Sequence, residues 1–222
     1  MSRTFSYFSS TIGRKQLVGL TGLGLSLFVL SHMLGNLLIF VSPQAYNEYG
    51  HALISNPFIY LIDAGLVAMF VMHLGIALKL SLENASARKE KYAVSSSGDK
   101  GTSLITKTMW HQGIVILVFT VYHLITFKYG TVYEITYDGV MMRDLHGLVI
   151  EVFQSPLYVV GYSIALVVLG VHLSHGVSSS LQSLGFHHPK YTPKLKLIGR
   201  LYAFVVAVGF ITQPFYVFFV HQ

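Results

Sequence analysis

Six histidines stand within long apolar stretches of this chain, where an ionisable side chain is costly. His32 lies in FVLSHMLGNLLIF, and no charged residue occurs between Gln16 and Asn47. Ionisable residues inside a membrane usually face the interior of a helix bundle and mark function. Imidazole is also a good ligand for iron, whereas a neutral imidazole in an interhelical hydrogen bond is the structural alternative. The six are His32, His73, His111, His123, His172 and His175.

The composition indicates a membrane protein. Of 222 residues, 53% are hydrophobic and 11% are charged, and the mean hydropathy is +0.58. A soluble domain averages about a quarter charged residues. There is no cysteine, which excludes disulfides, thiolate metal sites and cysteine-ligated iron–sulfur clusters. The N-terminal segment MSRTFSYFSSTIGRKQ lacks the apolar core and cleavage site of a secretory signal, so we expect it to be retained.

Five apolar segments are long enough to span a bilayer, which takes about 20 residues. Polar segments rich in Ser, Gly, Pro and charge separate them, and we expect these to be loops. Backbone groups in lipid must be satisfied within each span, so the sequence predicts an all-α, polytopic five-helix bundle. Residues 1–222 form a single domain in this interpretation. The predicted spans are 17–41, 57–80, 106–128, 156–181 and 199–220.

The basic residues predict the orientation. One side holds 13 of the 15 Lys and Arg residues, whereas the other has only Lys128 and Arg143, with five acidic residues. The positive-inside rule then places the N-terminus in the cytoplasm and the C-terminus outside. Topology therefore explains the net charge of +6 without nucleic acid. The 13 are Arg3, Arg14, Lys15, Lys79, Arg88, Lys89, Lys91, Lys100, Lys107, Lys190, Lys194, Lys196 and Arg200.

The depths of the histidines suggest two pairs. At a rise of about 1.5 Å per residue, His32 and His123 lie roughly 14 and 8 Å from the outer ends of their spans. His73 and His172 each lie roughly 24 Å from the outer ends of theirs. Each pair comes from two different helices, as two axial ligands on opposite faces of a haem must. This arrangement suits two bis-histidine haems stacked across the membrane.

Periodicity leaves alternatives open for the inner pair. His111 is also at inner depth, and His175 follows His172 by three residues, so either could replace His172. Gly22 and Gly113 stand ten residues before His32 and His123. They are expected near the depth of the inner pair, where a glycine admits either a flat macrocycle or a packed helix. The remaining histidines are expected to be solvated, in loops or at the chain end: His51, His146, His187, His188 and His221.

These stretches resemble the membrane cytochrome b subunit of succinate:quinone oxidoreductases, of the single-subunit, five-helix, di-haem type. The resemblance runs from about residue 10 to 195 in the family's order. Its most specific part is a histidine-rich helix end followed by a basic, proline-containing loop. The segments that carry it are STIGRKQLVGLTGL, SHMLGN, AYNEYGHALISNP, MHLGIALKL, VYHLITF and HLSHGVSSSLQSLGFHHPKYTP.

The resemblance implies two b haems, with His32 and His123 on the outer one and His73 and His172 on the inner one. His175 would then lie beside the inner haem. It implies a bacterial cytoplasmic membrane, a cytoplasmic flavoprotein subunit that interconverts succinate and fumarate, and an iron–sulfur subunit. Electrons would pass through this chain to menaquinone near the outer surface, and the dicarboxylate chemistry would take place on the partner.

A quinone site needs a proton-transfer group. Asp63 is the only acid inside a predicted span, and a structural Asp that is protonated or paired is the alternative. Asn36, Glu48 and His51 are expected to complete the pocket. Arg14, Lys107 and Arg200 are candidates for the haem propionates, and membrane anchoring explains them equally well. Some relatives have a glutamate where this chain has Gly170, which puts a proton route through that position in doubt.

Two other functions fit parts of the pattern. A di-haem cytochrome b of a hydrogenase or formate dehydrogenase would share the electron-transfer chemistry but have another partner. A haem-free, proton-coupled transporter would use the histidines and Asp63 as a relay. A haem spectrum separates the transporter from both cytochromes, and the co-purifying subunits separate the two cytochromes.

Overall fold

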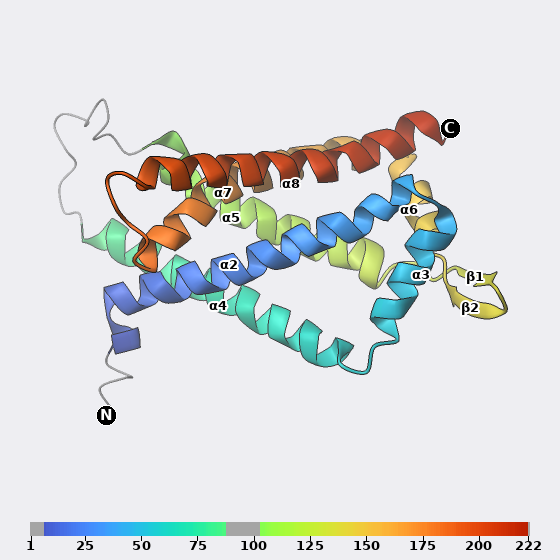
Figure 1. Ribbon diagram of the computed structural model, residues 1–222, viewed down its shortest axis with the longest axis horizontal. Helices are drawn as coiled ribbons and strands as arrows, with labels where there is room; N and C mark the ends of the chain where they lie inside the picture. The colour runs from blue at the N-terminus through green and yellow to red at the C-terminus, as the bar shows by residue number, and fades with distance from the viewer. Residues whose placement is uncertain (1–6, 88–102, 222) are drawn as a thin grey trace.

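Five long apolar helices form a bundle in the computed structural model, which describes residues 7–87 and 103–221 (Figure 1). Each is long and apolar enough to cross a membrane. The prediction of an all-α fold with five helices that could cross a membrane is therefore confirmed. The helices are α2 (Thr11–Asn36), α4 (Ile59–Ser86), α5 (Leu104–His123), α7 (Pro156–Ser183) and α8 (Thr192–Val220).

The helices extend beyond the predicted spans at one end of the bundle. The Ser10 side chain accepts a hydrogen bond from Gly13 N at 3.1 Å, and α2 therefore begins six residues before the predicted span, at Thr11. Ser103 caps α5 in the same way through Thr106 N. Such caps satisfy amide groups that have no partner within the helix.

α4 continues to Ser86 and thereby includes Glu83. The expectation that Asp63 is the only acid within a span was therefore wrong.

The helices alternate in direction along the long axis of the bundle (Figure 1). α2 packs along α4 and α7, and α7 packs along α5 and most extensively along α8. By contrast, α4 and α5 approach each other at few positions. None of the residues of α4 is buried. α7 is therefore the most central helix, whereas α4 is joined mainly to α2 and has a large exposed apolar surface.

Glycines permit the closest helix contacts. A Cβ atom added at Gly170 of α7 would lie 2.9 Å from Cβ of Ala207 on α8. One added at Gly209 of α8 would lie 2.5 Å from Sδ of Met33 on α2. Small residues at these positions let helix backbones approach closely, as in many membrane bundles.

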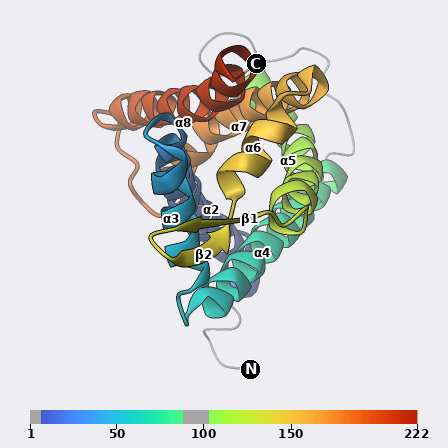
Figure 2. The ribbon, with the colours of Figure 1, turned by 90° about the vertical axis from the view of Figure 1, so that its right-hand side faces the viewer.

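One end of the bundle, here named the capped end, is covered by short elements (Figures 1 and 2). A short 3-10 helix, η1 (Leu37–Phe40), ends the first span, and helix α3 (Pro43–Ile54) follows. A β-hairpin of β1 (Glu134–Tyr137) and β2 (Val140–Arg143) comes before α6 (Leu145–Phe153). In the hairpin, Tyr137 pairs with Val140. The expectation of loops in these two segments was wrong, because both contain regular structure.

Local signals explain the two cap helices. Ser42 accepts a hydrogen bond from Ala45 N at 3.0 Å, and Pro43 occupies the first turn of α3. Asp144 caps α6 through Gly147 N at 2.8 Å. Serine or aspartate before a helix and proline in its first turn are frequent helix starts. A buried cluster beneath α6 joins it to α7 and α8: Ile39, Val149, Phe153, Val159, Tyr162 and Val217.

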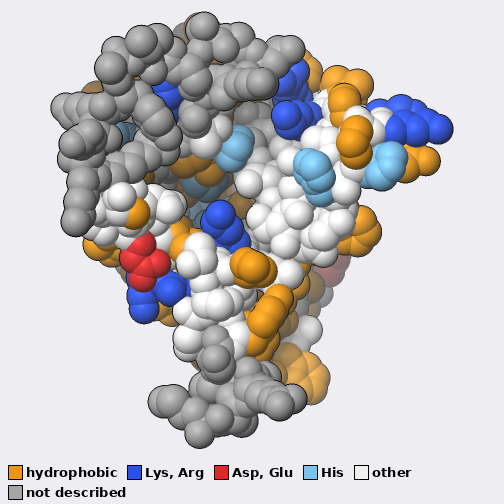
Figure 3. All heavy atoms as spheres, turned by 90° about the vertical axis from the view of Figure 1, so that its left-hand side faces the viewer, with side chains coloured by type: hydrophobic (Ala, Val, Ile, Leu, Met, Phe, Trp, Pro, Cys, Tyr) orange, Lys and Arg blue, Asp and Glu red, His pale blue; other side chains and the backbone are white. Residues whose placement is uncertain are grey.

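The opposite end, here named the basic end, carries the described cations of the predicted cytoplasmic side. They lie near the starts of α2, α5 and α8, on the last part of α4 and in the loop after α7. Figure 3 shows Lys, Arg and His side chains on this face. The other predicted cations lie outside the described residues: Arg3, Arg88, Lys89, Lys91 and Lys100.

Candidate functional site

His32 and His123 meet inside the bundle, between α2 and the end of α5. Their ring centroids are 5.8 Å apart, and the ring planes are nearly perpendicular, at 84°. Phe28 stacks on His32 at 5.6 Å, and Phe127 lies 5.3 Å from His123. Two residues 91 positions apart in sequence are thus brought together among aromatic side chains.

The helix changes type directly after His123. Residues Leu124–Lys128 form a short π-helix, labelled η3. Single π turns within α-helices are rare and often occur at functional sites. The sequence analysis did not predict this turn.

A hydrogen-bonded chain connects His32 to the capped end. The Tyr46 hydroxyl donates to Asn36 Oδ1 at 2.7 Å. The Asn36 amide donates to the His32 carbonyl at 2.8 Å and lies 3.4 Å from His32 Nδ1. Burial raises the pKa of Tyr46, so its phenol stays protonated and remains a donor. Tyr46 is a contributor to this site that the sequence analysis missed.

His73 of α4 is held through one ring nitrogen. Its Nδ1 lies 3.2 Å from the Val18 carbonyl and 3.2 Å from Thr21 Oγ1. A carbonyl can only accept, so the Nδ1 proton points at Val18, and Nε2 of the neutral ring keeps its lone pair. Metal-binding histidines usually have this arrangement, in which the ring nitrogen that does not bind the metal donates its proton to an acceptor such as a backbone carbonyl.

Gly22 makes room for the His73 ring. A Cβ atom at Gly22 would lie 3.1 Å from His73 Cε1 and 3.4 Å from Ser180 Oγ. The glycine therefore lets the His73 ring and helix α7 approach α2 closely. Of the two roles expected for Gly22, this is helix packing and not contact with a macrocycle. At Gly113 an added Cβ atom would meet nothing within 4 Å among the described residues.

His172 of α7 lies in the neighbourhood of His73 and His175. His175 Nδ1 is 3.4 Å from Thr106 Oγ1 and thus faces α5. His111, in contrast, is exposed on α5. Of the three inner candidates, the structure brings His172 to His73 and leaves His111 on the surface.

The histidines fit a pair of two-ligand metal sites. Nδ1 of His123 and Nδ1 of His172 are buried and have no hydrogen-bond partner in the described part of the chain. Neither ring is therefore fixed at Nδ1 by a protein acceptor, as the His73 ring is by the Val18 carbonyl. Two imidazoles on opposite sides of one metal ion have ring centroids roughly 6 Å apart, given bonds of about 2 Å. His32 and His123 are close to that separation.

A site with three or more protein ligands has no counterpart in residues 7–87 and 103–221. No group of three or more His, Cys, Asp or Glu side chains is placed to hold a metal ion there. A structural zinc site usually takes four such ligands, and a catalytic one three. The paired histidines therefore suit a prosthetic group that supplies its own equatorial ligands.

Asp63 is paired across helices. Its carboxylate receives a hydrogen bond from Lys128 Nζ at 2.5 Å, and both side chains remain partly exposed. The sequence analysis counted Lys128 only as a cation of the outer side, at the end of the span 106–128. The paired alternative thus describes the geometry of Asp63, and its role in proton transfer stays a prediction.

The other two predicted quinone residues, Glu48 and His51, lie on the side of α3 roughly opposite Tyr46. Glu48 accepts from Gln44 Nε2 at 2.8 Å, and His51 Nε2 lies 3.3 Å from Ser55 Oγ. Glu48 is exposed. Of the predicted quinone residues, Asn36 is the one that contacts His32. The α3 residue that bonds to Asn36 is Tyr46, which was not predicted.

The predicted propionate residues also separate. Arg14 Nη1 forms an ion pair with Glu83, at 2.5 Å from Oε1, between α2 and α4. Lys107 is exposed near the start of α5. Arg200 lines a groove between α7 and α8, and the α7 residues of that groove lie on roughly the opposite face from His172. The structure therefore does not gather these three cations at the histidines.

A buried polar network in the capped end was not foreseen. His146, expected to be solvated, is only 8% exposed, and this expectation was wrong. Its backbone N donates to Asn47 Oδ1 at 2.8 Å, and Asn47 Nδ2 donates to Asp144 Oδ1 at 2.7 Å. Burial lowers the pKa of His146, as does neighbouring His221, while the Asp144 carboxylate opposes the shift.

Gly170 stands where some relatives in the resembled family have a glutamate. A Cβ atom at Gly170 would lie 2.9 Å from Cβ of Ala207, so a larger residue there would require α7 and α8 to shift.

Comparisons of the chain with protein-family models, curated proteins and solved structures gave no match.

Proposed function

We propose that this chain is the membrane-anchor and electron-transfer subunit of a succinate:quinone oxidoreductase. In this proposal His32 and His123 bind the outer b haem, and His73 and His172 bind the inner one. The observation that carries it is the meeting of His32 and His123 at 5.8 Å between two helices. The fixed Nδ1 of His73 adds independent support, because it leaves Nε2 free to bind a metal.

A bound haem supplies reversible one-electron chemistry, and two histidine ligands leave no open iron position for oxygen or substrate. The Val18 carbonyl orients the His73 ring, and the Asn36 amide holds the backbone carbonyl of His32. Phe28 and Phe127 pack beside the outer pair of histidines. We assign the dicarboxylate chemistry to a partner subunit, as the resemblance implies.

The proposal assigns the two ends of the bundle different partners. The basic end faces the bacterial cytoplasm and docks the iron–sulfur and flavoprotein subunits, in line with the positive-inside rule. The capped end faces outward and receives menaquinone near Asn36, where the Tyr46 hydroxyl holds a proton. Asp63 remains the candidate proton-transfer group within the spans.

Ligand replacement tests the pairing. His32→Ala should remove the outer b-type signal and leave the inner one, because each haem has its own pair of histidines. His111→Ala is the matched control on α5 and should retain both signals. Loss of both haems from assembled His32→Ala protein contradicts separate sites, and loss of one haem from His111→Ala contradicts the assignment of His172.

The partner assignment has its own test. The purified complex should contain a flavoprotein and an iron–sulfur protein, and succinate should reduce its b-type signal. Reduction by hydrogen or formate instead would indicate the other class of di-haem cytochrome. A pure five-helix protein without any b-type spectrum would leave the proton-coupled transporter as the better explanation.

A further inference from the structure

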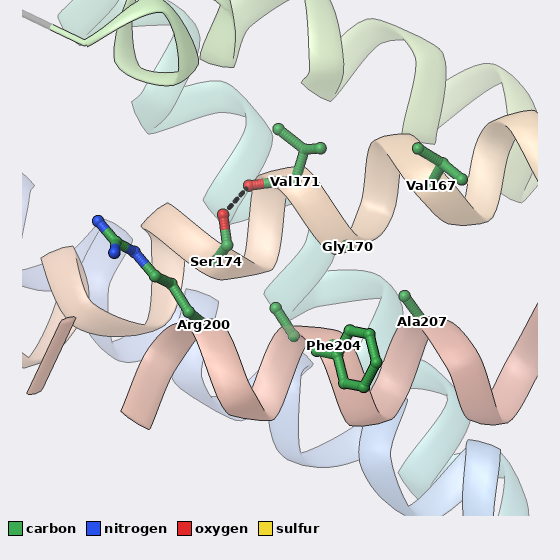
Figure 4. Close-up of a pocket in the computed structure, with 8 residues that line it drawn as sticks. Val167, Gly170, Val171, Ser174, Arg200, Phe204 and Ala207 are labelled. Atoms are coloured by element: carbon green, nitrogen blue, oxygen red, sulfur yellow. Dashed lines mark hydrogen bonds between the residues drawn. The ribbon is translucent and has the colours of Figure 1, made fainter. Parts of the chain in front are cut away.

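A narrow groove runs along the outside of the bundle between α7 and α8 (Figure 4). It has a volume of about 240 Å³ and opens to the outside of the bundle. Its floor and walls are apolar, and Arg200 and Ser174 stand together at one end. The apolar lining comprises Val167, Gly170, Val171, Ala203, Phe204 and Ala207.

The depth of Arg200 matches the edge of the hydrocarbon layer. α8 has 29 residues and is therefore about 43 Å long, which exceeds a bilayer core of about 30 Å. Its first nine residues, TPKLKLIGR, contain all three cations of the helix. The 21 residues from Arg200 to Val220 cover about 30 Å. Arg200 therefore lies at the boundary, with the apolar part of the groove extending from it into the membrane (Figure 4).

The charge around the groove is of one sign. After Glu151 the sequence contains no Asp or Glu, whereas the loop after α7 and the start of α8 contribute Lys190, Lys194, Lys196 and Arg200. The donor of Ser174 is already used, because its Oγ donates to the Val171 carbonyl at 2.7 Å. Arg200 is therefore the group at this end that can donate to an anion, and neither α7 nor α8 carries a carboxylate to compete.

We propose that this groove binds an anionic phospholipid. The phosphate contacts the Arg200 guanidinium, and one acyl chain lies along the apolar part of the groove past Phe204 and Val167. Cationic pockets between membrane helices are suited to anionic headgroups, and arginine matches phosphate geometry well. The site lies on a different face of α7 from His172, so it is independent of haem binding.

Native mass spectrometry of the purified protein tests this, with phosphatidylglycerol and phosphatidylcholine titrated separately. Phosphatidylglycerol should bind with fixed stoichiometry and more tightly than phosphatidylcholine. Arg200→Gln should weaken phosphatidylglycerol binding about tenfold, as expected for loss of a charge-assisted hydrogen bond. Lys194→Gln removes the same charge about 9 Å nearer the start of α8, outside the groove, and should have less than about a twofold effect.

A second variant distinguishes a lipid from a free anion. Val167 is 54% exposed, so Val167→Trp can fill the acyl part of the groove without disturbing the core. It should weaken phosphatidylglycerol binding while leaving Arg200 in place. Three outcomes overturn the proposal: equal binding of both lipids, equal effects of Arg200→Gln and Lys194→Gln, or unchanged lipid binding by Val167→Trp. The last indicates headgroup or phosphate binding alone.

Discussion

Replacing Gly170 by alanine should push α7 and α8 apart. The new Cβ atom would lie 2.9 Å from Cβ of Ala207, and both atoms are fixed to helix backbones. Carbon atoms prefer separations of about 3.5–4.0 Å, so the helices must separate locally by roughly 0.6–1.1 Å. Overpacking of this kind costs about 1–3 kcal/mol. Equilibrium unfolding in mixed micelles should show this loss of stability. The comparison needs a control variant in which another glycine of the same helix is replaced by alanine where the new methyl group has space.

Gly161→Ala provides that control on the same helix. A Cβ atom there meets nothing within 4 Å, so the change should stabilise the protein by about 0.5–1 kcal/mol through helix propensity alone. Combining Gly170→Ala with Ala207→Gly should recover most of the lost stability, because it removes the opposing methyl group. Equal stabilities of the two single glycine variants, or no recovery in the double variant, would show that α7 and α8 are not in close contact at this position.

Three further predictions concern Asp63, which is the predicted proton-transfer group, and two residues of the capped end. Asp63→Asn and Lys128→Gln should each cost more than the about 1 kcal/mol of a water-exposed ion pair, because each leaves one charge within a span without its partner. If Asp63 transfers protons, only Asp63→Asn should strongly reduce quinone-linked activity; equal activity losses contradict that role. Tyr46→Phe should lower the unfolding free energy by about 1–2 kcal/mol, since it leaves Asn36 Oδ1 without its donor, and an unchanged unfolding midpoint would argue against this bond. The pKa of His146 is lowered on folding, so its contribution to stability is present above about pH 6.5 and is lost as the pH falls below that value. The rate of amide hydrogen exchange in α3 and α6, corrected for intrinsic rates, should therefore rise as the pH falls, and this rise should be smaller in His146→Phe. Identical pH profiles of the wild type and the variant would contradict this.

Hydropathy was sufficient to predict the five spans, because each contains a long run without charge. It could not predict where the helices end. The first turns of α2 and α5 are polar, and their starts depend on Ser10 and Ser103 as caps. The extra turns at the basic end therefore lie outside what an apolar pattern can detect.

The structure of the capped end was missed although short-range signals were present. Ser42 and Pro43 are a typical start for α3. Asp138 and Gly139, with φ of 51° and 79°, form the kind of turn that Asp-Gly sequences favour between antiparallel strands. Polarity alone suggested loops, and the turn and capping residues would have corrected that expectation.

The proximity of His32 and His123 was predicted from depth, because depth depends only on position along a helix. The contacts around them depend on how the helices are rotated against each other. The bond from Tyr46 to Asn36 and the pairing of Asp63 with Lys128 join separate elements. No local pattern in the sequence specifies those rotations, so these partners emerge only in the folded chain.

A count of b haems per polypeptide in the purified protein, by the pyridine haemochrome method, gives the most direct check of the proposed function. Two haems per chain, both low-spin, are expected from the two histidine pairs. A folded five-helix protein that contains no haem after purification from haem-sufficient cells would contradict the proposal, and the histidines would then be structural or proton-conducting residues.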